Sequence, residues 1–197
     1  MKMNLPNKLT ILRVFMIPFF VIFMLLSVSG MDIEEASVSV SSFTAYRITA
    51  VAIFCIASFT DFLDGYIARK QGLVTDFGKF MDPLADKLLV CSALILLTAE
   101  GSLPSWVVII IIAREFIISG FRLVASDNGI VIAASWWGKF KTVSQMIMCI
   151  VLILPGVPKL IGPVVTGVII AAAVILTVVS LIDYMAKNIK VITDGGM

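Results

Sequence analysis

The sequence predicts an all-α integral membrane protein. Of its 197 residues, 60% are hydrophobic and 14% are charged, whereas a soluble domain carries about 25% charged residues. The apolar residues form long continuous runs rather than short alternating segments, which favours membrane helices over a β-barrel. No long linker and no low-complexity tract separates these runs. We therefore expect residues 1–197 to form a single membrane domain.

Six apolar segments are long enough to cross about 30 Å of hydrocarbon as helices. A short polar stretch, Met1–Lys8, precedes the first and is expected to lie in the membrane interface. Pro83 suits the first turn of a helix, so the third helix is expected to start near Asp82. Proline-containing breaks at Pro104 and around Pro155 separate the later segments. The expected transmembrane helices are 10–29, 44–66, 82–99, 104–124, 136–155 and 160–184.

The lysines and arginines indicate how these helices are oriented. If the N-terminus lies in the cytoplasm, thirteen of the 15 cationic residues fall on the cytoplasmic side, and only Arg47 and Lys159 fall outside. Cytoplasmic loops of membrane proteins carry such an excess of positive charge. We therefore expect a multi-pass protein of the cell membrane with both termini, and its active site, on the cytoplasmic side.

The chain contains no histidine. A histidine general base, a nucleophile activated by histidine and a histidine metal site are therefore excluded. Acid–base chemistry must fall to carboxylates, and four aspartates stand out at the ends of predicted helices. An ionised carboxylate costs about 2.5–3.5 kcal/mol at the centre of a membrane helix, so a group of four needs something positive to neutralise it. These aspartates are Asp61, Asp64, Asp82 and Asp86.

The four aspartates are spaced to form two matched helical faces. Asp61 and Asp64 share one stripe of a helix with two positions that lack bulky side chains, Gly65 and Ala68. Asp82 and Asp86 form an i, i+4 pair, again with small residues beside them. Hard oxygen ligands in this number suit Mg²⁺ or Mn²⁺, and two such ions could clamp both sides of a phosphoryl displacement.

A less specific interpretation treats the aspartates as interfacial charges. Each would then pair with a nearby cation, and no metal would be needed. That interpretation leaves the matched faces and the small residues between the carboxylates unexplained. The cations in question are Arg69, Lys70, Lys79 and Lys87.

The string Asp61-x2-Asp64-Gly65-x2-Ala68-Arg69-x8-Gly78-x3-Asp82-x3-Asp86 resembles the signature of the CDP-alcohol phosphatidyltransferases. The resemblance implies a homodimer of six-helix chains. It also implies a reaction in which an alcohol attacks the β-phosphate of a CDP-linked lipid and CMP is released. Asp61, Asp64 and Asp82 would be metal ligands, and Asp86 a further metal neighbour and the general base. The nucleotide would be met by Gly65, Ala68 and Arg69.

Two further strings resemble the branch of this family that uses glycerol 3-phosphate, the phosphatidylglycerophosphate synthases. They are Ile112-Ala113-Arg114-Glu115-Phe116 and Trp137-Gly138-Lys139-Phe140-Lys141-Thr142. The opening segment resembles that branch as well, which implies that Asn4 and Thr10 approach the donor nucleotide; helix capping is their alternative role. The substrates implied are CDP-diacylglycerol and glycerol 3-phosphate, and no nucleic-acid partner is expected.

Four cations in the second half of the chain fit an acceptor that carries a phosphate. A cluster of such groups suits a dianion, and a neutral acceptor such as inositol would not need it. Flanking charge and contact with anionic lipid are the alternative explanation. The residues are Arg114, Arg122, Lys139 and Lys141.

Two alternatives to this function stay open from the sequence. The same transferase chemistry could use inositol phosphate, inositol or another alcohol. A divalent-cation transporter is the rival from a different class, because carboxylates within a membrane also mark ion pathways. Clustering of the aspartates at one membrane side, without a broken midplane helix, argues against transport.

Overall fold

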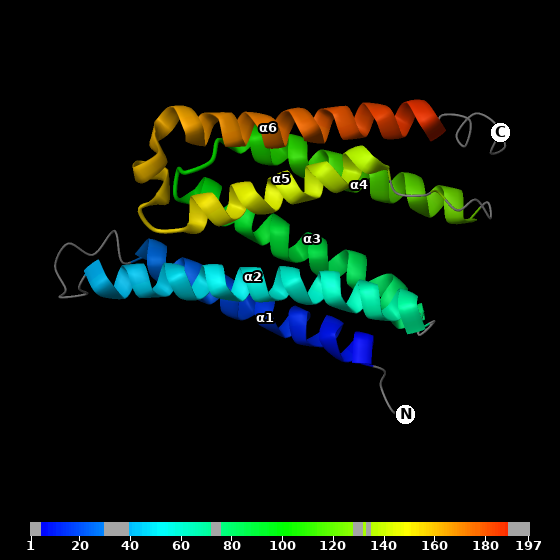
Figure 1. Cartoon of the computed structure of the whole chain (residues 1–197), viewed down its shortest axis with the longest axis horizontal. Helices are drawn as coiled ribbons and strands as arrows, with labels where there is room; N and C mark the ends of the chain where they lie inside the picture. Colours follow the sequence, from blue (N-terminus) through cyan, green and yellow to red (C-terminus); the bar gives the residue numbers. More distant parts are fainter. Residues whose placement is uncertain (1–4, 30–39, 72–75, 128–131, 133–134, 189–197) are drawn as a thin grey trace. The chain divides into compact units, whose positions relative to one another are not determined.

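The computed structural model describes residues 5–29, 40–71, 76–127, 132 and 135–188, and within these ranges it leaves out the side chains of 5, 6, 29, 40–42, 62–71, 76–80, 82, 83 and 127. The described part is entirely helical apart from short connections (Figure 1). Its six helices are α1 (Leu5–Ser29), α2 (Val40–Gln71), α3 (Asp76–Ala99), α4 (Ser105–Asp127), α5 (Trp136–Ile153) and α6 (Val157–Asn188).

Two compact units make up the chain. The first contains residues 1–102 and 149–157, and the second contains residues 103–148 and 158–197. The first unit therefore holds α1, α2, α3 and the end of α5. The second holds α4, most of α5 and nearly all of α6.

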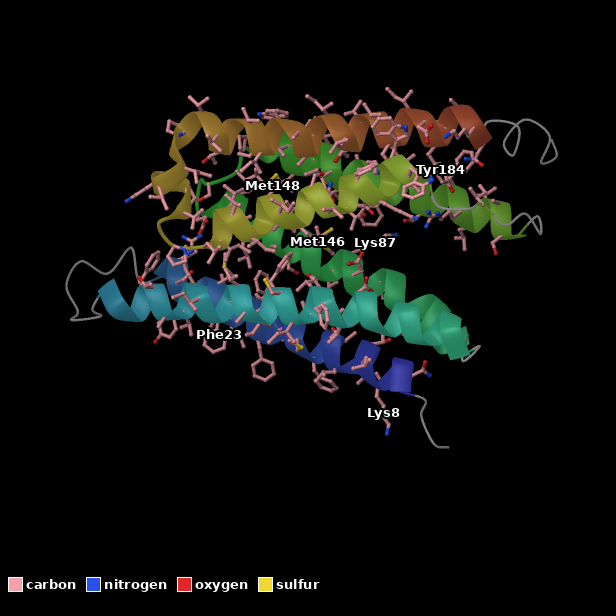
Figure 2. The ribbon with its side chains drawn as sticks, in the orientation of Figure 1. Lys8, Phe23, Lys87, Met146, Met148 and Tyr184 are labelled. Atoms are coloured by element: carbon pink, nitrogen blue, oxygen red, sulfur yellow. The ribbon has the colours of Figure 1, made fainter. Side chains whose placement is uncertain are left out.

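In the first unit, α1 packs along α2 and also contacts α3. The buried residues of α1 recur every three or four positions, as Ile17, Phe20 and Met24 show, so one stripe of the helix faces its neighbours. Phe20 meets Phe54 of α2 with ring centroids 5.8 Å apart. Phe23, labelled in Figure 2, lies 6.3 Å from the ring of Tyr46. These aromatic pairs tie the two helices together along their length.

The inner stripe of α6 in the second unit is unusually polar. Its buried residues are Ala173, Thr177, Ser180 and Tyr184, which follow the spacing of one helical face. The facing elements supply Gln145 and Lys141 of α5, both buried. Gln145 Nε2 donates to Thr177 Oγ1 at 3.0 Å, and Thr177 in turn donates to the carbonyl of Ala173. Hydrogen bonds of this kind join helices where the solvent is hydrocarbon.

Glycine sets the end of α3. The Gly101 N–H donates to the Thr98 carbonyl and the Ser102 N–H to the Leu97 carbonyl, both at 3.0 Å, which is the Schellman arrangement. It requires a left-handed residue, and Gly101 has φ 76°. Pro104 follows, so the chain turns before α4 as the sequence predicts.

Several expected boundaries were wrong in detail: α1 begins at Leu5 rather than 10, α2 spans Val40–Gln71 rather than 44–66, and α6 ends at Asn188 rather than 184. The starts of α3 and α6 also differ. The structure begins α3 at Asp76, six residues before Asp82, because a helix can pass through a proline by giving up one hydrogen bond; α1 does so at Pro18. The last helix begins at Val157 rather than 160 but is kinked at Gly162, with φ 80° and ψ 164°. Only glycine adopts that conformation readily, and Pro163 then restarts the helix at a position that suits it.

Three of the described helices are long and apolar enough to span a membrane, over Asn7–Val28, Phe43–Asp61 and Val157–Asn188. Large apolar side chains are also exposed, among them Phe15 at 63%, Phe116 at 69% and Leu160 at 84%. Exposed apolar surface of this kind marks contact with lipid or a partner, so the chain is a membrane protein. The other three helices, α3, α4 and α5, carry charged residues singled out above, among them Asp86, Arg114 and Lys141. That all six helices cross the bilayer, as one domain, stays a prediction.

Candidate active site

The aspartate signature falls on the end of α2 and the start of α3. Asp61 and Asp64 lie on α2 with Gly65, Ala68 and Arg69, and α3 carries Gly78, Asp82 and Asp86. The backbone is helical on both sides of residues 72–75, so the spacing argument from the sequence applies to real helices. Among these eight residues, the described side chains are those of Asp61 and Asp86, and both are partly exposed.

Asp61 is held by an arginine that the sequence did not single out for the site. Arg13 of α1 is fully buried, and its Nη1 donates to Asp61 Oδ1 at 2.7 Å. The Asp61 side chain keeps 34% of its surface exposed. The hydrogen bond from Arg13 fixes the orientation of the Asp61 carboxylate and leaves its other side accessible. In metal sites, hydrogen-bond partners of the ligating side chains orient those side chains in the same way.

Thr10 lies on the same inner stripe of α1 as Arg13 and is 1% exposed. The helix already spans Leu5–Ser29, so Thr10 stands in its second turn. Asn4 lies outside the described residues. The predicted contact of both residues with the donor nucleotide stays a prediction.

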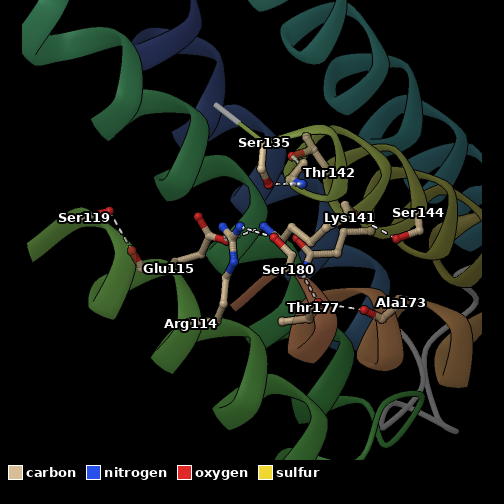
Figure 3. A network of polar contacts seen from close by, with 12 residues as sticks. Arg114, Glu115, Ser119, Ser135, Lys141, Thr142, Ser144, Ala173, Thr177 and Ser180 are labelled. Carbon is tan, nitrogen blue, oxygen red and sulfur yellow. Dashed lines mark hydrogen bonds and ion pairs between the residues drawn. The ribbon is translucent and has the colours of Figure 1, made fainter. Parts of the chain in front are cut away.

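The acceptor cluster predicted from the sequence divides into two pairs. Arg114 of α4 and Lys141 of α5 converge on one carboxylate, Glu115 (Figure 3). Arg114 Nη1 donates to Glu115 Oε1 at 3.0 Å, and Lys141 Nζ donates to the same oxygen. Arg114 Nη2 donates to Ser180 Oγ of α6 at 2.5 Å. This Glu115 network therefore joins α4, α5 and α6 through buried charges.

The backbone of α5 approaches the Glu115 network closely. A methyl group placed on Gly138 would lie 3.8 Å from Arg114 Nη2 and 3.9 Å from Ser180 Oγ. The Gly138 N–H donates to Ser135 Oγ at 3.1 Å, so Ser135 caps the first turn of α5. The cap fixes where α5 begins and thus where Lys141 stands one turn later.

Arg122 and Lys139 form the second pair, and each lies over an aromatic ring. The guanidinium carbon of Arg122 is 5.7 Å from the Tyr184 ring centroid. Lys139 Nζ is 4.3 Å from the Trp136 ring centroid. A cation over an aromatic face is attracted by the ring quadrupole, and both Arg122 and Lys139 remain exposed.

Two partners in this region were missed from the sequence, Ser180 and Tyr184. Their signal was present, because polar residues at 177, 180 and 184 interrupt an apolar helix with the spacing of one face. A polar stripe in a membrane helix predicts contact with other polar groups rather than with lipid.

The donor set on α2 and α3 fits a hard divalent cation. Carboxylate oxygens are the ligands that Mg²⁺ and Mn²⁺ prefer. The Asp61 carboxylate is partly exposed, and Arg13 donates a hydrogen bond to one of its oxygens. The Glu115 network has a different chemistry, because two buried cations share a single carboxylate. It fits an anion that could compete for Arg114 and Lys141.

Comparison with known proteins agrees with these features. The sequence model of the CDP-alcohol phosphatidyltransferases matches residues 3–179. A CDP-diacylglycerol–glycerol-3-phosphate 3-phosphatidyltransferase of Bacillus subtilis is 45% identical over 186 residues, 94% of this chain and 95% of its own length. A probable phosphatidylglycerophosphate synthase of Mycobacterium tuberculosis is 41% identical over 95% of this chain and 82% of its own. The Escherichia coli enzyme with the same name as that of B. subtilis is 40% identical over 75% of both chains. This chain therefore belongs to the CDP-alcohol phosphatidyltransferase family.

Proposed function

We propose that this chain transfers a phosphatidyl group from CDP-diacylglycerol to glycerol 3-phosphate. The products are phosphatidylglycerophosphate and CMP, so the reaction is a step of phospholipid biosynthesis. The observation that carries this proposal is the set of relatives named for that activity, which match most of the chain at 40–45% identity. The aspartate signature on α2 and α3 supports the same chemistry.

The bonds made and broken follow from the substrates. The 1-hydroxyl oxygen of glycerol 3-phosphate forms a bond to the β-phosphorus of CDP-diacylglycerol. The bond from that phosphorus to the bridging oxygen breaks, and CMP leaves with the electron pair. Asp86 accepts the hydroxyl proton, since the chain has no histidine to do so and a positioned carboxylate can serve as general base.

Asp61, Asp64, Asp82 and Asp86 are the residues that would hold Mg²⁺ or Mn²⁺, as one or two ions. Such an ion, when bound, supplies charge neutralisation and Lewis-acid polarisation of phosphoryl oxygens. Arg13 orients Asp61 by gripping Oδ1. Gly65 and Ala68 leave room for the nucleotide beside the α2 backbone, Arg69 meets its phosphates, and Asn4 and Thr10 lie near the donor.

Arg114, Arg122, Lys139 and Lys141 are proposed to hold the phosphate of the acceptor. What supports this role is their chemistry: all four are cations, and α4 and α5 carry them in one unit of the chain. Burial of Arg114 and Lys141 strengthens their attraction for an anion, because screening by water is weak there.

The protein is further proposed to be a multi-pass homodimer with both termini and the active site on the cytoplasmic side, as the family resemblance and the positive-inside pattern suggest.

A panel of acceptors tests the proposed function. Purified protein in detergent is given CDP-diacylglycerol and, in separate reactions, glycerol 3-phosphate, inositol, inositol phosphate or serine, with and without Mg²⁺. CMP release and the lipid product are measured, and an Asp82→Ala variant sets the background. We expect phosphatidylglycerophosphate only with glycerol 3-phosphate and only with the metal. Preference for another alcohol would overturn the acceptor, and no metal-dependent CMP release with any alcohol would overturn the transferase.

A further inference from the structure

The inner stripe of α1 changes from apolar to polar at the level where α2 reaches its first aspartate. Ile17 and Phe20 are buried and apolar, whereas Arg13 and Thr10, which precede them on the same stripe, are polar and at most 1% exposed. Polar groups buried between membrane helices are normally there to meet other polar groups. The polar end of the stripe therefore needs partners on the neighbouring helices.

Two contacts give the register between α1 and α2. Arg13 Nη1 donates to Asp61 Oδ1, and the Phe20 ring lies 5.8 Å from the ring of Phe54. Seven residues forward in α1 thus correspond to seven residues back in α2, so the two helices run antiparallel (Figure 1). Both helices rise by about 1.5 Å per residue, so this register continues along the pair.

The buried residues agree with this register. It places Ile17 opposite Ala57 and Met24 opposite Ala50, and all four side chains are at most 4% exposed. The register therefore holds over the apolar part of the interface, and it can be followed toward the N-terminus of α1.

The next step of the register brings Thr10 opposite Asp64. Thr10 lies three residues before Arg13, Asp64 lies three residues after Asp61, and the backbone is helical through these positions in both α1 and α2. Threonine differs from valine, which has the same shape, by its hydroxyl. Buried hydroxyls are hydrogen-bonded in most proteins, and a bond to an ionised carboxylate is among the stronger ones.

We propose that Thr10 is a positioning residue for Asp64, as Arg13 is for Asp61, with the Thr10 hydroxyl donating to the Asp64 carboxylate. The inference rests on the proposed function in taking both aspartates as metal ligands. It goes further by making the polar end of the α1 stripe the layer that orients these ligands. It also gives Thr10 a role at the metal rather than at the donor nucleotide.

Binding of Mn²⁺ tests this role without any turnover. Purified protein in detergent, without CDP-lipid or acceptor, is titrated with Mn²⁺, and the free ion is measured by electron paramagnetic resonance. Thr10→Val should raise the dissociation constant by about 10- to 100-fold, the usual effect of losing a partner that orients a metal ligand. Thr10→Ser keeps the hydroxyl and should bind Mn²⁺ nearly as wild type does.

Thr98→Val is the matched control. It makes the same substitution in the same unit, on α3, where the Thr98 hydroxyl donates to the Leu94 carbonyl of its own helix at 3.0 Å. We expect its Mn²⁺ dissociation constant to equal that of wild type. Weakening of Mn²⁺ binding in Thr98→Val as large as in Thr10→Val would overturn the specific role of Thr10.

Two other roles of Thr10 give different results. A role in packing alone would lower the thermal midpoint of the metal-free protein in Thr10→Val and Thr10→Ser and leave Mn²⁺ binding unchanged. A role at the nucleotide would weaken binding of CMP in Thr10→Val, again with Mn²⁺ binding unchanged. Either pattern would overturn the proposal.

The role of Thr10 and the proposed function can fail separately. Intact CMP release, with no saturable Mn²⁺ binding by wild type or with the same dissociation constant in Thr10→Val, would overturn the role of Thr10 and leave the transferase standing. Mn²⁺ binding with the expected variant pattern, in a protein that releases no CMP with any alcohol, would support the role of Thr10 and count against the transferase.

Discussion

Arg13 of α1 donates from Nη1 to Oδ1 of Asp61 on α2 across 2.7 Å. The arginine is fully buried, whereas the aspartate side chain keeps a third of its surface exposed. The contact therefore joins the interior of the first unit to the start of the aspartate signature. One oxygen of Asp61 accepts a hydrogen bond from a residue 48 positions away in the sequence, and this bond fixes the orientation of the carboxylate.

The first prediction concerns the ion pair between Arg13 and Asp61. Arg13→Gln should raise the Mg²⁺ concentration needed for half-maximal transfer by about 10- to 100-fold, the usual effect of losing a partner that orients a metal ligand. Arg13→Lys should need a Mg²⁺ concentration between those of wild type and Arg13→Gln, because the lysine ammonium keeps the positive charge but lacks the planar guanidinium with its paired donors. The measurement is CMP release against Mg²⁺ concentration at saturating substrates. Arg47→Gln is the matched control, since it breaks another buried ion pair on α2; an equal shift in both variants would contradict the role of Arg13.

The second prediction concerns Asp86. Asp86→Asn keeps the size and polarity of the side chain but removes its basicity, so turnover should fall by about 10²- to 10⁴-fold. Binding of CDP-diacylglycerol should persist, because the proposed role is proton acceptance from the acceptor hydroxyl. Turnover is measured at saturating substrates and metal, and donor binding is measured directly without acceptor. Loss of donor binding with near-normal turnover at saturation would identify Asp86 as a ligand and not as the base.

The third prediction concerns the counter-ion of the Glu115 network. Glu115→Gln leaves Arg114 and Lys141, 9% and 4% exposed, without their shared carboxylate. Loss of one partner from such a buried group is typically worth about 3–5 kcal/mol, so the thermal midpoint of the ligand-free protein should fall. In the variant, Glu115 no longer competes with glycerol 3-phosphate for the two cations, so the ligand should bind more tightly than in wild type. A ligand that binds only the folded state stabilises it more as its affinity rises, so glycerol 3-phosphate should raise the midpoint more in the variant.

Glu100→Gln is the control for that experiment. It also removes a buried carboxylate that pairs with an arginine, but it does so in the first unit. We expect a lower midpoint in this variant and no gain in the response to glycerol 3-phosphate. If Glu115→Gln and Glu100→Gln respond alike to the ligand, Arg114 and Lys141 do not bind the acceptor phosphate.

The helices, and the positions of the four aspartates on them, could be predicted from the sequence because both depend on local spacing. Continuous apolar runs determine where a membrane helix forms, and an i, i+3 or i, i+4 spacing determines which residues share a face. Partners in space could not be predicted in this way. Nothing near Asp61 in the sequence indicates Arg13, and nothing near Arg114 indicates Ser180, because these contacts depend on how helices pack. The kink at Gly162 was missed for a similar reason, since glycine permits an unusual backbone without requiring it.

The sequence could also not show how the surroundings of the four predicted acceptor-binding cations differ. Sequence counting treats Arg114, Arg122, Lys139 and Lys141 as four equivalent cations. The structure distinguishes them, because Arg114 and Lys141 share Glu115 while Arg122 and Lys139 lie over aromatic rings. The environment of a charge, and not its presence, determines how strongly it attracts a substrate.

The last prediction concerns Arg47, one of the two cations that the sequence places outside. Its Nη2 donates to Glu100 Oε1 at 2.7 Å and to the Leu152 carbonyl at 3.2 Å, and its Nε donates to the Ile153 carbonyl at 2.8 Å. The last two residues belong to the end of α5, where carbonyls lack partners within the helix. Arg47 therefore caps α5 and neutralises Glu100, whose side chain is 1% exposed.

Arg47→Met should consequently lower the free energy of unfolding by about 3–5 kcal/mol, because Glu100 is left buried and unneutralised. The double variant Arg47→Met/Glu100→Met should lose less than Arg47→Met alone, since two apolar groups in contact leave no unpaired charge. Unfolding of the two variants, of Glu100→Met and of wild type in the same detergent gives the coupling energy of the pair. Additive losses across this cycle would mean that Arg47 acts through the α5 carbonyls alone and that its pairing with Glu100 contributes nothing to stability.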